Sequence, residues 1–438
     1  MIEGWVALLL IMGSCIALMF IGMPVVFSFL TVTMVGVILL WGGQSGLEQL
    51  VLSIFDTLST FSFIPLPLFI LMGELMFNSG LASDMIDALD KWIGRVPGRL
   101  GLLAVGAGTM FSTLTGSSMS SVAMLGSTLV PQMRERNYGK LMTLGPILGS
   151  GGLAMMIPPS GMAVLIGALA EVSIGDLWMA IVIPGLLMAF LYASYIIITC
   201  KLKPAIAPPY PVSSTTLSDK IVSSLKYILP LGGIFFLVVG LIIFGIATPS
   251  ESAAAGTFGC IILSAAHGRV NWNMFKKSVL NSAQIAGMVL IIIAGAGAFS
   301  QILAFTGGSK FLIGLATELP VAPIVIIIAM QVILIFLGMF MTIMAILMIT
   351  IPLFMPVILS LGFDPIWFCV LFMLNMEMGT TSPPFGLSLF VMKSLAPDDV
   401  TIGDCYRAAL PFLGCDLIAM ALIIAFPVVA LWLPSIAR

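Results

Sequence analysis

Two short polar clusters interrupt long uncharged stretches of this chain, and both combine glycine with hydroxyl side chains. The first, Thr-Gly-Ser-Ser at 115–118, lies in the middle of the uncharged run 100–133. The second contains Gly338 and Thr342 and lies in the uncharged run between Glu318 and Asp364. Neutral hydroxyl and carbonyl oxygens are suitable ligands for hard cations. The clusters therefore predict cation binding.

Each cluster is followed by a segment that glycine and proline interrupt. The first interrupted segment carries Gly-Ser-Gly-Gly at 149–152 and Pro-Pro at 158–159, and the second reads Gly-Thr-Thr-Ser-Pro-Pro at 379–384. Two successive prolines remove two backbone donors, so a helix must break there. Carbonyl groups at the ends of half-helices carry partial negative charge and coordinate cations in transporters with discontinuous helices. We expect each break to complete a cation site beside the preceding cluster.

The candidate ligands are the hydroxyls of these segments and the residues around them. We predict that two or more sodium ions are bound by Thr113, Gly116, Ser117, Ser118, Ser150, Gly151, Gly338, Met341, Thr342, Gly379, Thr380 and Ser382. The neighbouring candidates for contact with a transported substrate are Ser120, Pro159, Ser160 and Pro384.

Sodium is favoured over protons because few titratable groups lie near the breaks. The single histidine, His267, falls in a predicted loop. Glu377 is the only acid within the second interrupted segment, and acids inside a membrane are functional candidates. Its carboxylate either tunes a cation site, relays a proton or has a structural hydrogen-bonding role. We expect Glu74 to be structural.

The composition places the chain among helical membrane proteins that cross the bilayer several times. Of the 438 residues, 60% are hydrophobic and 8% are charged, and the mean hydropathy is +1.20. These values exclude a soluble protein. The sequence has no nucleic-acid-binding pattern, and its six cysteines form no CxxC pair. The apolar N-terminal segment lacks a preceding basic region and is predicted to be a first spanning helix.

The uncharged run 100–133 is predicted to be a re-entrant hairpin. Basic residues lie on both sides of it, at 91, 95 and 99 and at 134, 136 and 140. Basic loops stay on the cytoplasmic side, so both ends of the run face one compartment. One crossing requires roughly 20 residues, and the run is too short for two. The hairpin thus places its polar tip inside the membrane, where irregular backbone must be buried in protein or line a cavity.

A shift of 225 residues aligns the prolines of the two halves of the chain. Pro24 corresponds to Pro249, Pro131 to Pro356, and the Pro-Pro pair at 158–159 to that at 383–384. The flanks of the hairpin are basic in the first half and acidic in the second, which indicates repeats of inverted topology. The predicted fold is therefore all-α and polytopic, with a hairpin and a broken helix in each repeat.

The domain organisation follows from this repeat. We expect a first repeat at 1–200, a cytoplasmic connector at 201–226 and a second repeat at 227–438, with hairpins near 100–133 and 320–360 and broken helices near 141–170 and 366–396. A basic amphipathic piece around Arg269, Lys276 and Lys277 is expected to precede a helix near 282–304, and one last helix is expected near 408–433. Both termini are predicted to be periplasmic.

Four motifs resemble the large membrane subunit of tripartite ATP-independent periplasmic (TRAP) transporters. They are GSSMSS at 116–121, IPPS at 157–160, ATPSE at 247–251 and GTTSPPFG at 379–386. The resemblance implies a sodium-driven elevator transporter in the bacterial inner membrane, surrounded by lipid, that imports an organic acid such as sialic acid or a C4-dicarboxylate. It also implies two partners, a small four-helix membrane subunit and a periplasmic substrate-binding protein. We expect the small subunit to be a separate polypeptide.

Other functions are less compatible with the sequence. A standalone divalent-anion/sodium symporter that works without a binding protein has the same hairpin design and is the nearest alternative. A passive channel would not require two oppositely oriented hairpins. A primary pump would carry a GxxxxGK[ST] phosphate loop, and a zinc protease would carry HExxH, and neither motif occurs. We therefore expect no enzymatic activity.

Overall fold

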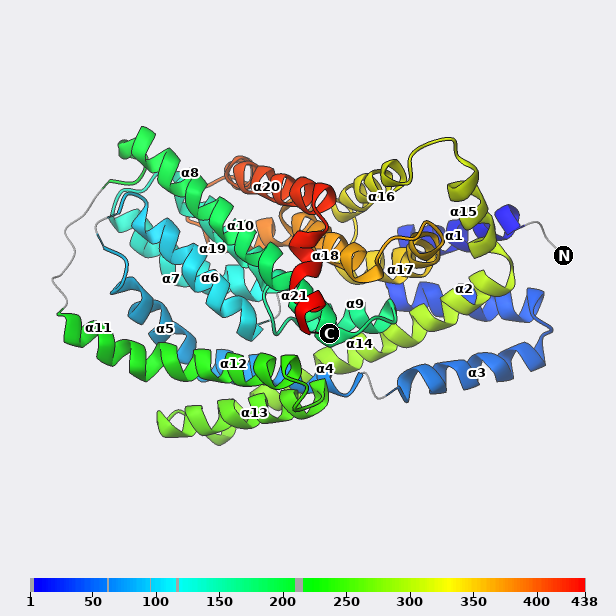
Figure 1. The fold of residues 1–438 in the computed structure, drawn as a ribbon, viewed down its shortest axis with the longest axis horizontal. Coiled ribbons are helices and arrows are strands. Elements are labelled where there is room, and N and C mark those ends of the chain that lie inside the picture. Colours follow the sequence, from blue (N-terminus) through cyan, green and yellow to red (C-terminus); the bar gives the residue numbers. More distant parts are fainter. Residues whose placement is uncertain (1–3, 61–62, 95, 116–117, 209–215, 438) are drawn as a thin grey trace.

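The computed structural model of the chain consists of helices joined by short turns, and its described part contains no β-strand (Figure 1). The described residues are 4–60, 63–94, 96–115, 118–208 and 216–437. Within these ranges, five helical stretches are long and apolar enough to cross a membrane, or six if the bent pair α8–α9 counts as one span. The prediction of an all-helical, multi-pass membrane protein is confirmed by these lengths and compositions.

The described residues of the first half of the chain form ten α-helices. They are α1 (Gly4–Phe20), α2 (Val25–Leu40), α3 (Gln44–Leu58), α4 (Pro65–Asn78), α5 (Leu81–Asp90), α6 (Arg99–Thr115), α7 (Ser118–Glu135), α8 (Lys140–Met156), α9 (Gly161–Leu169) and α10 (Ile174–Leu202).

The second half contributes eleven more α-helices to the described part of the chain. They are α11 (Leu217–Ser223), α12 (Leu229–Ile243), α13 (Pro249–Ala266), α14 (Trp272–Phe305), α15 (Gly308–Glu318), α16 (Pro323–Gly338), α17 (Ile343–Ser360), α18 (Pro365–Thr381), α19 (Leu387–Leu395), α20 (Ile402–Ala425) and α21 (Val428–Ala437).

The helices α6 and α7 occupy the residues of the expected first hairpin. They pack against each other, and both pack against α8. The backbone N–H of Leu100, at the start of α6, donates a hydrogen bond to the Tyr138 Oη, just after the end of α7, over 3.4 Å. Because the start of one helix meets the end of the other, the two run antiparallel. The side of the membrane from which this hairpin enters stays a prediction.

The helices α16 and α17 occupy the range expected for the second hairpin. They contact each other, and both contact α18. However, α17 alone is long and apolar enough to cross a membrane. The re-entrant character of this second helix pair therefore stays a prediction, as does the inverted repeat.

Both Pro-Pro pairs lie where a helix is interrupted. The axis bends by 48° between α8 and α9, which the residues 157–160 separate. The residues 382–386 separate α18 from α19. The Pro-Pro pair explains each break, because proline cannot donate the backbone hydrogen bond that would continue the helix.

Three boundaries differ from the sequence-based expectations. The connector expected at 201–226 is partly helical, because α10 runs to Leu202 and α11 begins at Leu217. Lys276 and Lys277 of the basic amphipathic piece lie in one continuous helix, α14, with the segment expected near 282–304, whereas Arg269 precedes this helix. The last helix expected near 408–433 is divided into α20 and α21 at Phe426 and Pro427.

The helices that carry the candidate ligands form one packed group. Helix α8 contacts α6, α7, α18 and α20, and α10 packs along α8, α18 and α20. Around this group, α14 packs against α2, α3 and α4, and α13 packs against α4 and α12. In Figure 1, α1, α2 and α3 lie at one end of the elongated molecule, and α6, α7 and α11 lie at the other.

Cysteine labelling tests the orientation of the α6–α7 hairpin. Val96 and Glu135 flank it and are exposed, and all six native cysteines are buried. We expect Val96→Cys and Glu135→Cys both to react with a membrane-impermeant thiol reagent only from the cytoplasmic side. Ser173→Cys, beyond the following broken helix, is the matched control and should react only from the periplasm. Labelling of Val96→Cys and Glu135→Cys from opposite sides would contradict the hairpin.

Candidate functional site

The first hairpin and the second broken helix meet at a buried hydrogen bond. Ser118 is the first residue of α7, next to the hairpin tip, and Glu377 lies on α18. The Ser118 Oγ donates to the Glu377 Oε2 over 2.8 Å. Both residues are buried, with 2% and 1% of their surfaces exposed. A carboxylate from the second half of the chain thus lies at the hairpin of the first half.

Two glycines of α8 allow this approach. A Cβ atom on Gly152 would lie 2.8 Å from the Glu377 Cγ and still closer to the carboxylate carbon and Oε1. A Cβ atom on Gly151 would lie 3.3 Å from the carbonyl oxygen of Ser118. Larger residues at 151 and 152 would therefore collide with the hairpin or with Glu377.

Two hydroxyl groups lie at the end of α18, and that of Thr380 is close to the same carboxylate. The Thr380 Oγ1 donates to the Glu377 backbone oxygen over 2.9 Å and lies 3.5 Å from its Oε1. The Ser382 Oγ donates to the Met378 carbonyl over 2.7 Å. Each hydroxyl uses its proton in these bonds, so its oxygen retains lone pairs that a cation can share.

The second hairpin touches its broken helix through glycine backbone. A Cβ atom on Gly338, at the end of α16, would lie 2.9 Å from the Gly379 Cα. Thr342 caps α17, and its side chain accepts a hydrogen bond from the Ala345 N–H over 3.4 Å. Thr342 is exposed and Met341 is half-buried.

The remaining candidates lie around the first break or at the surface. The Ser150 Oγ is buried and donates to the Pro146 carbonyl over 2.5 Å. Ser160 caps α9 by accepting from the Ala163 N–H over 3.3 Å. Pro159 is buried, whereas Ser120 and Pro384 are exposed. The side chain of Thr113, as well as Gly116 and Ser117, lies outside the described residues.

The structure therefore brings together part of the predicted ligand set. Ser118 and Thr380 lie at Glu377, Gly151 lies against Ser118, and Gly338 lies against Gly379. The exposed substrate candidates Ser120 and Pro384 do not belong to the buried cluster around Glu377. The assignment of these residues to sodium or substrate stays a prediction.

Comparison with known proteins establishes the family. The family model described as "Tripartite ATP-independent periplasmic transporter, DctM component" matches residues 12–429. The chain belongs to the DctM family of TRAP transporters. This membership indicates a transport role and confirms the resemblance found in the motifs.

Similar proteins include other large permeases of TRAP systems. The C4-dicarboxylate TRAP transporter large permease protein DctM of Pseudomonas aeruginosa is 31% identical over 91% of this chain and 92% of its own length. The sialic acid TRAP transporter large permease protein SiaM of Vibrio cholerae is 27% identical over 99% of this chain and 98% of its own. These two DctM-family relatives are named for different substrates.

A solved structure shares the fold. The YdaH transporter of Alcanivorax borkumensis superposes with a TM-score of 0.61, covering 87% of this chain and 88% of its own, at 16% identity. At that identity the likeness extends to the fold of this DctM-family chain and no further.

Two interior residues, Asp416 and Gly152, were not among the site candidates of the sequence analysis. Asp416 on α20 accepts a hydrogen bond from the Tyr192 Oη of α10, and both side chains are buried. The signal for Asp416 was its position as the only charged residue between 408 and 433. Gly152 was missed as well, although the repeat shift relates it to Glu377 (377 − 152 = 225).

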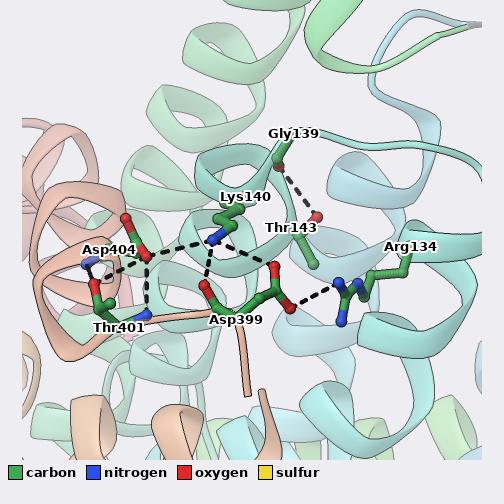
Figure 2. A network of polar contacts seen from close by, with 7 residues as sticks. All are labelled: Arg134, Gly139, Lys140, Thr143, Asp399, Thr401 and Asp404. Atoms are coloured by element: carbon green, nitrogen blue, oxygen red, sulfur yellow. Dashed lines mark hydrogen bonds and ion pairs between the residues drawn. The ribbon is translucent and has the colours of Figure 1, made fainter. Parts of the chain in front are cut away.

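A charged network joins the two halves of this DctM-family chain away from the buried site (Figure 2). The Arg134 Nη2, at the end of α7, lies 2.7 Å from the Asp399 Oδ1. The Lys140 Nζ, at the start of α8, lies 3.3 Å from the Asp399 Oδ2 and 3.8 Å from the Asp404 Oδ2. Asp404 also closes a capping box with Thr401 at the start of α20. The network ties the first hairpin and broken helix to the loop after the second broken helix.

The network predicts a specific acid sensitivity. Partial desolvation acts to raise the pKa of Asp399, but the hydrogen bonds and positive charges of Lys140 and Arg134 outweigh it and hold this pKa below its usual value. A carboxyl group whose pKa is depressed on folding contributes stability above its unfolded pKa, about 4, and loses it as the pH falls further. The pairs are solvent-exposed, so the contribution is small.

We therefore expect Asp399→Asn to lower the thermal unfolding midpoint slightly at pH 7 and to flatten its decline below about pH 4. Asp56→Asn, at an exposed position on α3, is the control. Equal acid dependence in wild type and Asp399→Asn would show that the network does not stabilise the fold.

Proposed function

We propose that this chain is the large membrane subunit of a sodium-coupled importer of an organic-acid anion in the bacterial inner membrane. The observation that carries the proposal is the pair of buried hydroxyl oxygens of Ser118 and Thr380, which the first hairpin and the second helix break bring together, in a chain of the DctM family. Such a set suits a hard cation. Two or more sodium ions are proposed, one at each hairpin with its neighbouring helix break.

Two partners belong to the proposal. The family description names a tripartite periplasmic system, which supports a small four-helix membrane subunit and a periplasmic binding protein beside this chain. The binding protein would deliver the substrate and make the first selection. The two relatives are named for a C4-dicarboxylate and for sialic acid, so we propose an organic acid of either class.

The proposed movement is of the elevator type. Helices α6–α9 and α16–α19 would move together and carry the substrate, while α1–α4 and α12–α14 would form the scaffold. The packing of α8 against α6, α7 and α18 supports a single moving unit, and the long helix α14 contacts α2, α3 and α4 on the scaffold side. Both chain termini are proposed to be periplasmic.

Uptake by proteoliposomes tests the sodium coupling. Vesicles containing this chain and its small subunit, with a loaded binding protein outside, should accumulate substrate when sodium is present and lose this uptake when choline replaces it. Uptake that continues in choline and follows a proton gradient would contradict sodium coupling.

Alanine variants at the hairpin tips refine this test. Ser117→Ala and Thr342→Ala should each raise the sodium concentration for half-maximal uptake by roughly 5- to 150-fold, the effect of losing one neutral ligand. Ser14→Ala is the control, because the Ser14 hydroxyl bonds the Leu10 carbonyl within α1 over 2.6 Å. Unchanged sodium dependence in both tip variants would leave only backbone oxygens as ligands there.

A further inference from the structure

We infer that the Glu377 carboxylate is a direct ligand of the cation at the first hairpin, although Glu377 belongs to the second repeat. The inference rests on the sodium coupling proposed above and adds the one charged ligand. Its basis is the bond of 2.8 Å from the Ser118 Oγ to the Glu377 Oε2 and the contact of this carboxylate with Gly152. All three residues lie at the first hairpin and its helix break.

Among the described residues, no positive side chain forms an ion pair with Glu377. Within the described part of the chain, the ion pairs involve Arg99, Arg134, Lys140 and Arg269 with other acids, and none reaches Glu377. A buried ionised carboxylate is costly unless it is paired or coordinates a metal. It offers about four lone-pair sites, and Ser118 accounts for one of them, because the Thr380 proton goes to the Glu377 backbone oxygen. A bound cation would supply the missing compensation.

The repeat explains why only one of the two equivalent positions, 152 and 377, carries a carboxylate. Gly152 and Glu377 occupy equivalent positions (377 − 152 = 225), and they contact each other. Equivalent residues of two repeats that touch lie on the axis relating those repeats. A glutamate in both places would bring two like charges together. The chain instead has glycine in one repeat and glutamate in the other, so the two cation sites differ in charge.

Glu74 provides a contrast and a matched control. Its Oε2 accepts hydrogen bonds from the Asn78 Nδ2 and the Asn281 Nδ2, both over 3.0 Å. These amides join α4 and α14. The Glu74 carboxylate is thus held by neutral structural partners and has no role in the inferred site.

Sodium-dependent thermal unfolding of the purified complex with the small subunit tests the inference without relying on transport. Sodium chloride is exchanged for choline chloride at constant ionic strength, and the unfolding midpoint is followed. A ligand that binds the folded state raises this midpoint in proportion to the logarithm of its concentration over its Kd. We expect Glu377→Gln to require about 10-fold or more sodium than wild type for the same shift, whereas Glu74→Gln should require the same concentration.

Gly152→Ala provides a second variant that keeps the charge. The added methyl group occupies the position of the carboxylate and should displace it, which raises the sodium requirement in the same direction. Gly106→Ala is its control, because a Cβ atom there meets nothing within 4 Å. In the double variant Gly152→Ala/Glu377→Ala the methyl group has no carboxylate to displace. Its sodium requirement should therefore equal that of Glu377→Ala alone.

The outcomes separate this inference from the proposed function. Absence of any sodium effect on the wild-type complex would contradict sodium coupling itself. A normal wild-type response together with an unaltered response of Glu377→Gln would overturn the carboxylate ligand alone. If Glu377→Gln yields no folded complex, an unaltered sodium response of Gly152→Ala overturns the inference instead.

Discussion

Valine in place of Gly379 is expected to reduce transport by at least about 100-fold. A Cβ atom on Gly379 would lie 3.1 Å from the Gly338 Cα and 3.5 Å from the Gly338 carbonyl oxygen. Both obstructing atoms are backbone, so a change of rotamer cannot relieve the contact. Helix α16 must move away from α18, and metal sites tolerate ligand displacements of only about 0.2 Å. The displacement affects the backbone of α16 and α18, which are both proposed to hold the second cation. The loss of transport should therefore match that of the most severe variants that lose one ligand.

The measurement is uptake by proteoliposomes at saturating substrate and a series of sodium concentrations. Gly287→Val in α14 is the control, because a Cβ atom on Gly287 meets nothing within 4 Å. Overpacking of this kind typically costs about 1–3 kcal/mol, so co-purification with the small subunit should show that the Gly379→Val protein still assembles. Full transport by an assembled Gly379→Val protein would mean that the contact between α16 and α18 has no role in the transport cycle.

Omission of the periplasmic binding protein is expected to reduce uptake by about 100-fold or more at low substrate concentration. A docked binding protein releases its ligand beside the membrane site, where the effective concentration is far above that of dilute free substrate. The tripartite family assignment supports this dependence. The measurement compares initial uptake rates with and without the loaded binding protein, at the same total substrate concentration.

An unrelated periplasmic binding protein, loaded with its own ligand, is the control and should not restore uptake. Equal rates with and without the cognate binding protein would favour the alternative of a standalone divalent-anion/sodium symporter. That outcome would not affect the proposed sodium sites, because the proposal places them at the hairpins and does not involve the delivery of substrate.

Local chemistry explains which parts of the fold could be predicted from the sequence. The break between α8 and α9 follows from the Pro-Pro pair at 158–159, because proline cannot continue the helix. The α6–α7 hairpin follows from an uncharged run with basic residues on both sides. The family could be recognised from four short motifs, and the family model confirmed it.

Other boundaries depend on packing that the sequence leaves open. No glycine or proline lies between Trp272 and Ala286, so α14 can continue from its basic end into its apolar part once α2, α3 and α4 cover it. Pro411 and Pro434 lie inside helices, whereas Pro427 follows the end of α20. Proline alone therefore does not decide where the last helix divides.

The contact between Ser118 and Glu377 illustrates a different limit. The two residues are 259 positions apart in the sequence, and hydrophobic periodicity reports only on neighbours within one element. The sequence analysis placed Glu377 with the second helix break, where it resides on α18, but its carboxylate lies at the first hairpin. The repeat shift that relates Gly152 to Glu377 was the available signal, because equivalent residues meet when they lie close to the axis between repeats.

The number of sodium ions transported with each substrate molecule tests the central claim most directly. Proteoliposomes with this chain, its small subunit and the loaded binding protein are given ²²Na⁺ and labelled substrate together, and the initial fluxes of both are compared. Two cation sites, one at each hairpin, predict at least two sodium ions per substrate. Substrate uptake that is accompanied by no sodium flux would contradict the account.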